Sequence, residues 1–301
     1  MPYPEHNLKR FFKYTSASTA LKILEASTVR YSSPLLFNDP FDVQSGLHFD
    51  FDIQSLPDKI LERIEHFVAS DTKPTLPQDD PWGHAVALMW EKKATHGFPR
   101  ERVRTMLRPA LEWLRDQIAL VQSQYQKAWW EDFLPRLRVF SVAEAKDTLL
   151  MWSHYAESHT GVVFSFRVLP EEDNLLCVAK PVVYCKAPPS LFTEAEWLDD
   201  IFGVNRLDSS ALHFRYAYVK SEVWAYEREW RVWDLLPRRQ TVLHSDYRLR
   251  DREVEAVYLG CKISAEHKDT LMSLVATKYP EEKLFQARKP VDEFALCFDA
   301  I

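Results

Sequence analysis

Carboxylates, arginines and large aromatic rings alternate in the run Trp224-Ala225-Tyr226-Glu227-Arg228-Glu229-Trp230-Arg231. In a strand, alternate side chains face opposite ways, so Glu227, Glu229 and Arg231 would share one face. Two carboxylates beside a guanidinium could carry acid–base or electrostatic chemistry on a bound ligand. The pattern also fits a solvated strand face, or a helix in which Glu227 and Arg231 form an i,i+4 pair.

A second run that could carry chemistry covers residues 151–161, where aromatic rings, hydroxyls and histidines follow one another closely. On a helix, Trp152, Tyr155 and His159 lie near one face, where their rings could stack on a planar ligand. His154 could gain or lose a proton near neutral pH. A core-facing aromatic stripe with surface histidines explains the same pattern, because buried aromatic rings dominate protein cores.

A polar turn over 38–42 follows an expected short strand over 28–32. Loops at strand ends carry binding and catalytic residues more often than other segments do. Asn38 and Asp39 could therefore face a ligand. They could equally bond their own backbone in an Asx turn, with φ of the next residue fixed by Pro40.

The composition argues against several classes of function. The chain of 301 residues has only 6 glycines and contains neither GxGxxG nor GxxxxGK[ST], so Rossmann and P-loop enzymes are disfavoured. It contains no GxSxG and no HExxH, so acid–base chemistry is favoured over a serine nucleophile or a zinc site. The four cysteines form no CxxC pair, which favours reduced thiols and no bound metal.

The hydropathy of the chain favours a cytoplasmic protein. No apolar run approaches the ~20 residues that span a bilayer. Residues 1–10 also lack the apolar core of a signal peptide. We therefore expect no membrane association.

Charge is distributed unevenly along the chain. The net charge of −6 argues against extensive coating of nucleic acid, but residues 91–138 carry ten Lys or Arg against six Asp or Glu. Aromatic residues interleave with these basic ones, as in many surfaces that bind RNA or DNA. An amphipathic helix with a solvated basic face gives the same pattern more often.

Short strands and helices mix along the chain without regular βαβ alternation. Apolar periodicity predicts strands over 11–15, 28–32, 138–142, 162–166, 181–185 and 254–259, and helices over 16–26, 56–69, 82–96, 100–134 and 264–279. Capping boxes are expected at Ser141 with Glu144 and at Thr193 with Glu196, each starting a helix. The class is therefore α+β with small mixed or antiparallel sheets. We expect a single domain over 1–301, with a helical insertion over 53–136.

Five blocks appear in a fixed order outside the insertion. They are Phe12-Lys13-Tyr14-Thr15; Arg30-Tyr31-Ser32-Ser33-Pro34 with Phe37-Asn38-Asp39-Pro40-Phe41-Asp42; Phe140-Ser141; Met151-Trp152-Ser153-His154-Tyr155-Ala156 with His159 and Gly161; and Lys220 with Trp224, Tyr226-Glu227 and Glu229-Trp230-Arg231. In this order the chain resembles the bacterial domain-of-unknown-function family 2971. The family name itself implies no activity.

A weaker resemblance is to ADP-ribosyltransferase folds. It implies that Lys13 and Thr15 match the first NAD-binding block, in which Lys13 replaces the usual His or Arg. It further implies that Tyr155 stacks on nicotinamide, that Glu229 is the catalytic glutamate and that Glu227 is its partner. The ligand-binding residues expected in full are Lys13, Tyr14, Thr15, Arg30, Ser32, Asn38, Trp152, His154, Tyr155 and Arg231.

The chemistry that this resemblance implies is the consumption of NAD as a substrate. Breaking the bond between nicotinamide and ribose develops positive charge on the sugar, which Glu229 would stabilise in the transition state. Glu227 would activate the acceptor, which could be water, a small molecule, a protein or a nucleic acid. Lys13 and Arg30 would neutralise the pyrophosphate. A toxin or defence role would suit such an enzyme.

Two other functions compete with this one. The first is a non-catalytic module that binds nucleic acid or protein through the basic helical insertion. The second is a metal-dependent nuclease or nucleotide hydrolase that uses Asp39, Asp42 and the two glutamates.

Overall fold

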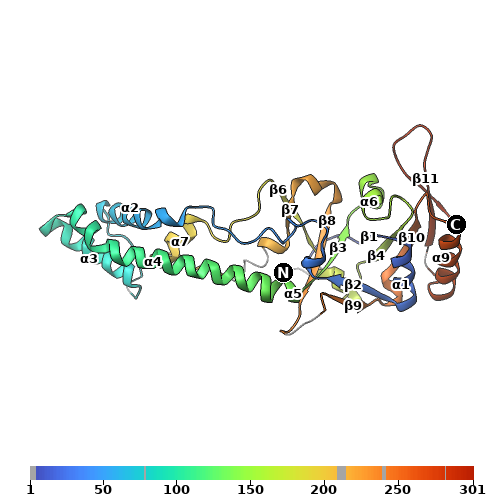
Figure 1. Ribbon diagram of the computed structural model, residues 1–301, viewed down its shortest axis with the longest axis horizontal. Helices are drawn as coiled ribbons and strands as arrows, with labels where there is room; N and C mark the ends of the chain where they lie inside the picture. The colour runs from blue at the N-terminus through green and yellow to red at the C-terminus, as the bar shows by residue number, and fades with distance from the viewer. Residues whose placement is uncertain (1–4, 78, 209–214, 239–241, 282) are drawn as a thin grey trace. The chain divides into compact units, whose positions relative to one another are not determined.

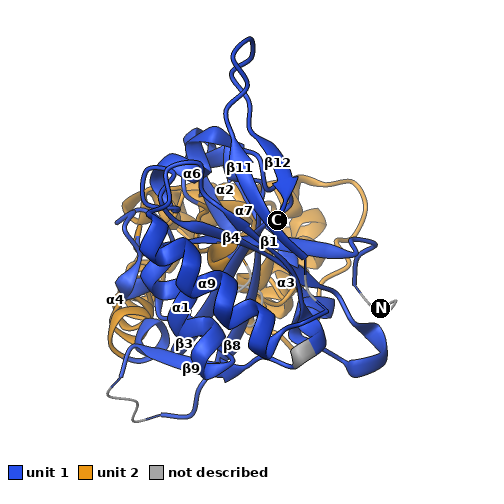
Figure 2. Ribbon diagram, turned by 90° about the vertical axis from the view of Figure 1, so that its right-hand side faces the viewer, with its two compact units in different colours: residues 1–44, 132–188, 218–301 blue, residues 45–131, 189–217 orange. Residues whose placement is uncertain are grey.

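The computed structural model describes residues 5–77, 79–208, 215–238, 242–281 and 283–301. Its contacts divide the chain into two compact units, shown in different colours in Figure 2. Unit 1 contains residues 1–44, 132–188 and 218–301, and unit 2 contains residues 45–131 and 189–217. Both helices and strands are present, so the predicted α+β class is confirmed. No helix in the described part of the chain is both long and apolar enough to cross a membrane.

Unit 1 is built on one large mixed sheet rather than on the small sheets expected. Its main path is β12-β11-β10-β4-β1-β3-β2-β9, and β8 pairs with both β3 and β5. The strands are β1 (Arg10–Thr15), β2 (Thr28–Ser32), β3 (Leu137–Ala143), β4 (Val162–Arg167), β5 (Lys180–Pro181), β8 (Glu229–Leu235), β9 (His244–Arg248), β10 (Val254–Leu259), β11 (Lys283–Arg288) and β12 (Cys297–Ala300). A separate parallel pair joins β6 (Val183–Cys185) to β7 (Val219–Ser221).

Strand β3 explains why the short strands join into one sheet. It pairs along its length with β8, from Leu137 opposite Leu235 to Ala143 opposite Glu229. Its ends also pair with β1 and β2, and all of these pairings are antiparallel. Residues far apart in the sequence therefore meet at β3.

Helices α1 (Ala17–Ala26) and α9 (Ala265–Lys278) lie side by side on the sheet (Figure 2). Their buried side chains, such as Leu24 and Leu271, form the main core with apolar residues of β1, β4 and β10. Ser16 caps α1 by accepting a hydrogen bond from the backbone N–H of Thr19, as expected for a helix start. A second core cluster lies under the short helix α6 (Leu149–His154).

The helix predicted after Ser141 begins later than expected. Strand β3 continues to Ala143 because β8 pairs with it that far, and α6 begins at Leu149. The capping box predicted at Ser141 and Glu144 is therefore wrong. Glu144 instead accepts a hydrogen bond from the indole N–H of Trp230, at 2.7 Å.

Unit 2 is helical, with α2 (Leu56–Ala69), α3 (Pro81–His96), α4 (Arg100–Ala128) and α7 (Glu194–Ile201) (Figure 1). Asp80 caps α3 through the backbone N–H groups of Trp82 and Gly83. The capping box predicted at Thr193 and Glu196 is confirmed at the start of α7. Helix α4 continues through Pro109 and is followed by a π-helical turn (Trp129–Phe133) and α5 (Leu134–Arg136). The π-helical turn and α5 lie where the sequence predicted the end of a single helix over 100–134.

The remaining elements are short 3-10 turns. They are η1 (Pro34–Leu36), η2 (Ile53–Ser55), η4 (Pro170–Glu172), η5 (Leu175–Val178), η6 (Glu222–Glu227) and η7 (Asp251–Glu253). Of these, η1 and η6 flank the site described next.

Candidate functional site

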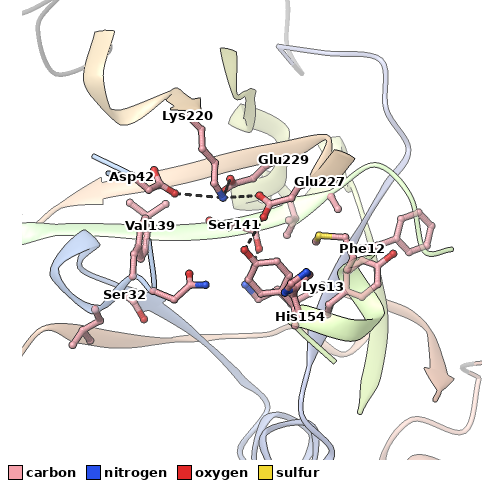
Figure 3. Close-up of a pocket in the computed structure, with 18 of the residues that line it drawn as sticks. Phe12, Lys13, Ser32, Asp42, Val139, Ser141, His154, Lys220, Glu227 and Glu229 are labelled. Atoms are coloured by element: carbon pink, nitrogen blue, oxygen red, sulfur yellow. Dashed lines mark hydrogen bonds and ion pairs between the residues drawn. The ribbon is translucent and has the colours of Figure 1, made fainter. Parts of the chain in front are cut away.

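A cavity of about 450 Å³ opens in unit 1, where β3 pairs with β1 and β2. The segment that follows η1, helix α6, β7 and β8 complete its wall (Figure 3). Its volume lies within the range of small-molecule pockets, roughly 300–1,000 Å³. Nine of the residues selected from the sequence line it: Lys13, Tyr14, Arg30, Ser32, Asn38, His154, Tyr155, Glu227 and Glu229.

The run around Glu227 and Glu229 is a strand only in its second half. Residues Glu222–Glu227 form η6, and Arg228 adopts a left-handed conformation with φ of 45°. Strand β8 begins at Glu229, because the left-handed residue changes the direction of the chain before it. The predicted alternation therefore holds for Glu229 and Arg231, whereas Glu227 reaches the pocket from a turn.

Lys220 lies at the centre of the polar group in this pocket (Figure 3). Its ammonium donates to Glu227 Oε2 at 2.5 Å and to Glu229 Oε2 at 3.1 Å, and lies 3.5 Å from Asp42 Oδ2. Arg231 binds two of these carboxylates, with Nε 2.8 Å from Glu229 Oε1 and Nη2 2.7 Å from Asp42 Oδ2. We call Asp42, Lys220, Glu227, Glu229 and Arg231 the acid–base cluster. All five residues are at most 7% exposed.

The two glutamates of the cluster have opposite proton affinities. Burial opposes the charge of Glu229, but the charges of Arg231 and Lys220 outweigh it and lower the pKa of Glu229. Burial raises the pKa of Glu227, and the nearby charge of Glu229 raises it further, although Lys220 partly offsets both. At neutral pH Glu229 is therefore firmly ionised, and Glu227 is the carboxylate that accepts a proton more readily.

The cations of the cluster are held in their charged forms. Burial disfavours the ammonium of Lys220, but Glu229, Asp42 and Glu227 outweigh this effect and raise its pKa. Burial likewise opposes the charge of Arg231, and Glu229 and Asp42 again raise the pKa. The three carboxylates face these two cations, which leaves one excess negative charge when all are ionised.

Hydroxyl groups fix both glutamates in place. The Tyr155 hydroxyl donates to Glu227 Oε1 at 2.6 Å, and burial raises the pKa of Tyr155. The Ser141 side chain also lines the pocket and helps to lower the pKa of Glu229. The Tyr184 hydroxyl accepts the backbone N–H of Glu229 at 2.8 Å, and burial raises the pKa of Tyr184 to about 12. Both carboxylates are thus oriented before any ligand binds.

The other wall of the pocket carries Lys13, His154 and Arg30. The Lys13 ammonium donates to the backbone oxygen of Ser141 at 2.8 Å, and burial lowers the pKa of Lys13 to about 8. Arg30 donates to both carboxylate oxygens of Asp246, at 2.8 and 3.0 Å, so its charge is already partly neutralised. The Tyr14 hydroxyl donates to the backbone oxygen of Ala145 at 2.8 Å.

Three residues expected at the ligand lie elsewhere. Trp152 is fully buried in the core, where its indole N–H donates to the backbone oxygen of Lys146 at 2.7 Å. Thr15 is buried in the sheet opposite Val162. Arg231 acts behind the pocket wall through Glu229 and Asp42. Of the aromatic residues expected on one helix face, Trp152 points into the core, whereas Tyr155 lines the pocket.

The sequence pattern left three important residues without a role. Lys220, Ser141 and Tyr184 come from β7, β3 and β6, and they reach the glutamates through pairings between distant strands. The only sequence evidence for a functional role of Lys220 or Ser141 was their place in the ordered blocks. Asp42 was named only as a possible metal ligand.

The carboxylates of this pocket are engaged by cations of the protein itself. Among the described residues, no three His, Cys, Asp or Glu side chains are arranged to hold a metal ion. Asp39 forms the predicted Asx turn, in which Oδ1 accepts the backbone N–H of Phe41 at 2.9 Å. Asp42, Glu227 and Glu229 are instead paired with Lys220 and Arg231, an arrangement suited to acid–base chemistry.

In unit 2, the basic face of α4 is largely paired within the protein. Arg104 Nε lies 2.6 Å from Glu65 Oε1, and Arg108 Nη2 lies 2.8 Å from Asp58 Oδ1. Phosphate binding relies on Lys and Arg that are free to neutralise phosphates. The nucleic-acid surface expected on this segment stays a prediction.

Comparison with known proteins gives one match. A family model described as "Protein of unknown function (DUF2971)" matches residues 151–232. No curated protein and no solved structure matches the chain. The matched segment includes His154, Tyr155 and four of the five members of the acid–base cluster. The DUF2971 model therefore matches the part of the chain that carries helix α6 and most of the acid–base cluster.

Proposed function

We propose that the pocket of unit 1 cleaves the bond between nicotinamide and ribose in NAD and transfers the ADP-ribose to an acceptor, as an ADP-ribosyltransferase-like enzyme does. One observation carries the proposal. Two buried glutamates with opposite pKa shifts face the same small-molecule cavity. Titratable groups whose environments separate their proton affinities are typical of acid–base active sites.

Glu229 has the properties needed to stabilise a positively charged sugar. Departure of nicotinamide develops positive charge on the ribose, and a fixed carboxylate stabilises this charge more in the transition state than in the ground state. Arg231 and Lys220 hold Glu229 ionised, so its charge is in place before the sugar becomes positive. Glycosidases use paired acids on the same principle.

Glu227 is suited to act as the general base toward the acceptor. Its raised pKa makes it a stronger base than an ordinary carboxylate, closer to the optimum for proton transfer at neutral pH. Its hydrogen bond to Tyr155 holds it at the pocket wall. With water as the acceptor the reaction is NAD hydrolysis, and with a protein or nucleic acid it is ADP-ribosylation.

The rest of the pocket supplies groups for the remainder of NAD. The ring of Tyr155 lies on the wall, where it would stack on nicotinamide, and Lys13 and Arg30 would meet the pyrophosphate. Ser32 and Asn38 offer further hydrogen bonds from β2 and the turn after η1. Such a reaction would draw on cytoplasmic NAD and would suit a toxin or defence role.

The test is nicotinamide release from NAD by the purified protein, with and without cell lysate. We expect release from the wild type, and a loss of about 100-fold or more for Glu229→Gln, because a preorganised charge is removed. Glu222→Gln is the matched control, since Glu222 is an exposed glutamate of η6 outside the pocket. A requirement for lysate would identify a macromolecular acceptor.

Glu229→Gln leaves two buried cations less well paired, so its folding must be checked separately. Tyr155→Phe removes only the hydroxyl that holds Glu227, and we expect it to fold and to lose activity more mildly. Thermal unfolding with NAD or an oligonucleotide provides a second readout, because a ligand that binds the folded state raises Tm. Full nicotinamide release by folded Glu229→Gln protein would refute the assignment, and stabilisation by oligonucleotide alone would favour a binding module.

A further inference from the structure

Two lysines reach the same pocket, but their ammonium groups contact different atoms. Lys220 lies among three carboxylates, which hold it protonated. Lys13 lines the cavity from β1 and feels the charges of Glu229 and Glu227 without a hydrogen bond to either. Its hydrogen-bond partner is a neutral backbone oxygen, that of Ser141, and its ammonium lies 5.1 Å from the centre of the Phe140 ring. No ion pair joins Lys13 to a carboxylate within the described part of the chain.

We propose that Lys13 is a nucleophile of this pocket, which forms a covalent imine with C1′ of the ribose during turnover. This inference rests on the proposed function and changes one part of it: Lys13 meets the ribose, and Arg30 alone is left to neutralise the pyrophosphate. Amine nucleophiles in enzymes are typically lysines desolvated in partly apolar pockets, because desolvation favours the neutral amine. Lys13 has that environment, whereas Lys220 does not.

The pKa of Lys13 agrees with this role. Burial lowers it to about 8, although Glu229 and Glu227 act in the opposite direction. An ordinary lysine has a pKa of about 10.4. Near pH 7.5, the neutral amine of Lys13 would therefore be on the order of 100-fold more abundant than that of an ordinary lysine.

The covalent step balances with the groups present. The Lys13 nitrogen attacks C1′ as the bond from C1′ to nicotinamide breaks, and the electron pair of that bond neutralises the positively charged nicotinamide ring. The proton lost by the amine passes to a water molecule. The ribose ring then opens, O4′ takes this proton, and a protonated imine joins Lys13 to C1′. Water hydrolyses the imine, which releases ADP-ribose and restores the amine.

The experiment uses ADP-ribose itself, whose open-chain aldehyde can form the same imine without any cleavage of NAD. The full-length protein is incubated with ADP-ribose and sodium borohydride, which reduces an imine to a stable secondary amine, and the adducts are mapped by peptide mass spectrometry. We expect the adduct on Lys13 to exceed that on the exposed Lys9 by on the order of 100-fold near pH 7.5. Labelling of Lys13 should reach half its maximum near pH 8, following its pKa of about 8.

Two variants test the assignment. Lys13→Arg keeps the charge and removes the nucleophile, so the adduct and the covalent step should be lost while the fold is kept. Lys9→Arg, at an exposed position before β1, should change neither. Adducts spread evenly over the lysines, or none on Lys13, would overturn the proposal.

Measurement of nicotinamide release separates this proposal from the proposed function. Release from NAD without any adduct on Lys13 leaves the function standing and removes the covalent step. An adduct on Lys13 without nicotinamide release supports the imine-forming amine and removes NAD as its donor.

Discussion

Ion pairs in the two units have the same chemistry but very different surroundings. In unit 1, the side chains of Lys220 and Glu227 are 6% and 3% exposed. In unit 2, those of Arg108 and Asp58 are 41% and 53% exposed. Exposed pairs contribute roughly 0–1 kcal/mol each, because water and salt screen them. The pairs between α2 and α4 therefore add little to the stability of unit 2, which rests on its apolar helix faces.

The buried cluster of unit 1 cannot be explained by stability either. Taking charges out of water costs several kcal/mol per ion, and replacing a buried ion pair by apolar residues is often neutral or stabilising. A cluster of five buried charged residues is therefore unlike what folding alone favours. Exposed pairs such as those of unit 2 keep a surface soluble at little cost, whereas the buried charges of unit 1 are costly and agree with the proposed active site.

The largest expected difference between the units comes from removing one lysine in each. Lys220→Met leaves three carboxylates buried with only Arg231 between them, so we expect a loss of about 3–5 kcal/mol in the free energy of unfolding. Lys59→Met in α2 removes one partner of an exposed pair with Glu62 and should cost at most about 0.5 kcal/mol. Urea unfolding measures both. Equal losses would mean that the cluster is no more interdependent than the surface pairs.

A smaller effect should appear in how two glutamates contribute to stability, because their contributions change with pH in opposite directions. The pKa of Glu196 in unit 2 is lowered to about 2, first by its hydrogen bond with Arg215, so its contribution is complete above about 4.5 and is lost as pH falls toward 2. The pKa of Glu227 is raised, so the folded state holds its proton more tightly than the unfolded state does. Its ionisation therefore lowers stability as pH rises above about 4.5.

Two variants distinguish these opposite dependences of stability on pH. Relative to the wild type, Glu196→Gln should lose about 1 kcal/mol between pH 2 and pH 5, a value discounted because this side chain is partly exposed. Glu227→Gln should instead gain in relative stability as pH rises above about 4.5. Unfolding across this pH range is the measurement. Parallel pH curves for the two variants would contradict the opposite assignments.

The smallest effect concerns salt. Arg108→Gln should cost about 0.5 kcal/mol at low ionic strength and almost nothing at 1 M salt, because exposed charges are screened. Asp42→Asn acts on a buried partner of Arg231, so its cost should change little with salt. Chemical unfolding at two salt concentrations compares them. A strong salt dependence for Asp42→Asn would show that water reaches the cluster.

Local patterns in the sequence predicted the helices of unit 2 and most strands of unit 1. The apolar spacing of α2 and the capping box at Thr193 need only neighbouring residues, so both were predicted. Ser141 and Glu144 match a capping box equally well. Residues up to Ala143 instead form a strand, because β3 pairs with β8 in a continuous ladder. A motif of four residues cannot reveal a strand that arrives about ninety residues later.

The candidate site likewise contains residues that local sequence predicted and residues that only distant strand pairing brings in. Glu227, Glu229 and Tyr155 stood out because each lies in a short run of unusual residues. Lys220 is a single lysine, and its role depends on the pairing of β6 with β7 and on the turn at Arg228. Trp152 and Tyr155 cannot be distinguished by helical spacing alone, because both lie near the same face.

The hydrogen bond between Asp42 and Arg231 spans 189 residues of sequence, and all of unit 2 is encoded between them. During synthesis, domains form as the chain emerges from the ribosome, at about 5–20 residues per second. The helices of unit 2 depend on short-range contacts, so α2, α3 and α4 can form early. The acid–base cluster must wait until β8 has emerged. Under the proposed function, a chain still on the ribosome would consume no NAD until β8 had emerged.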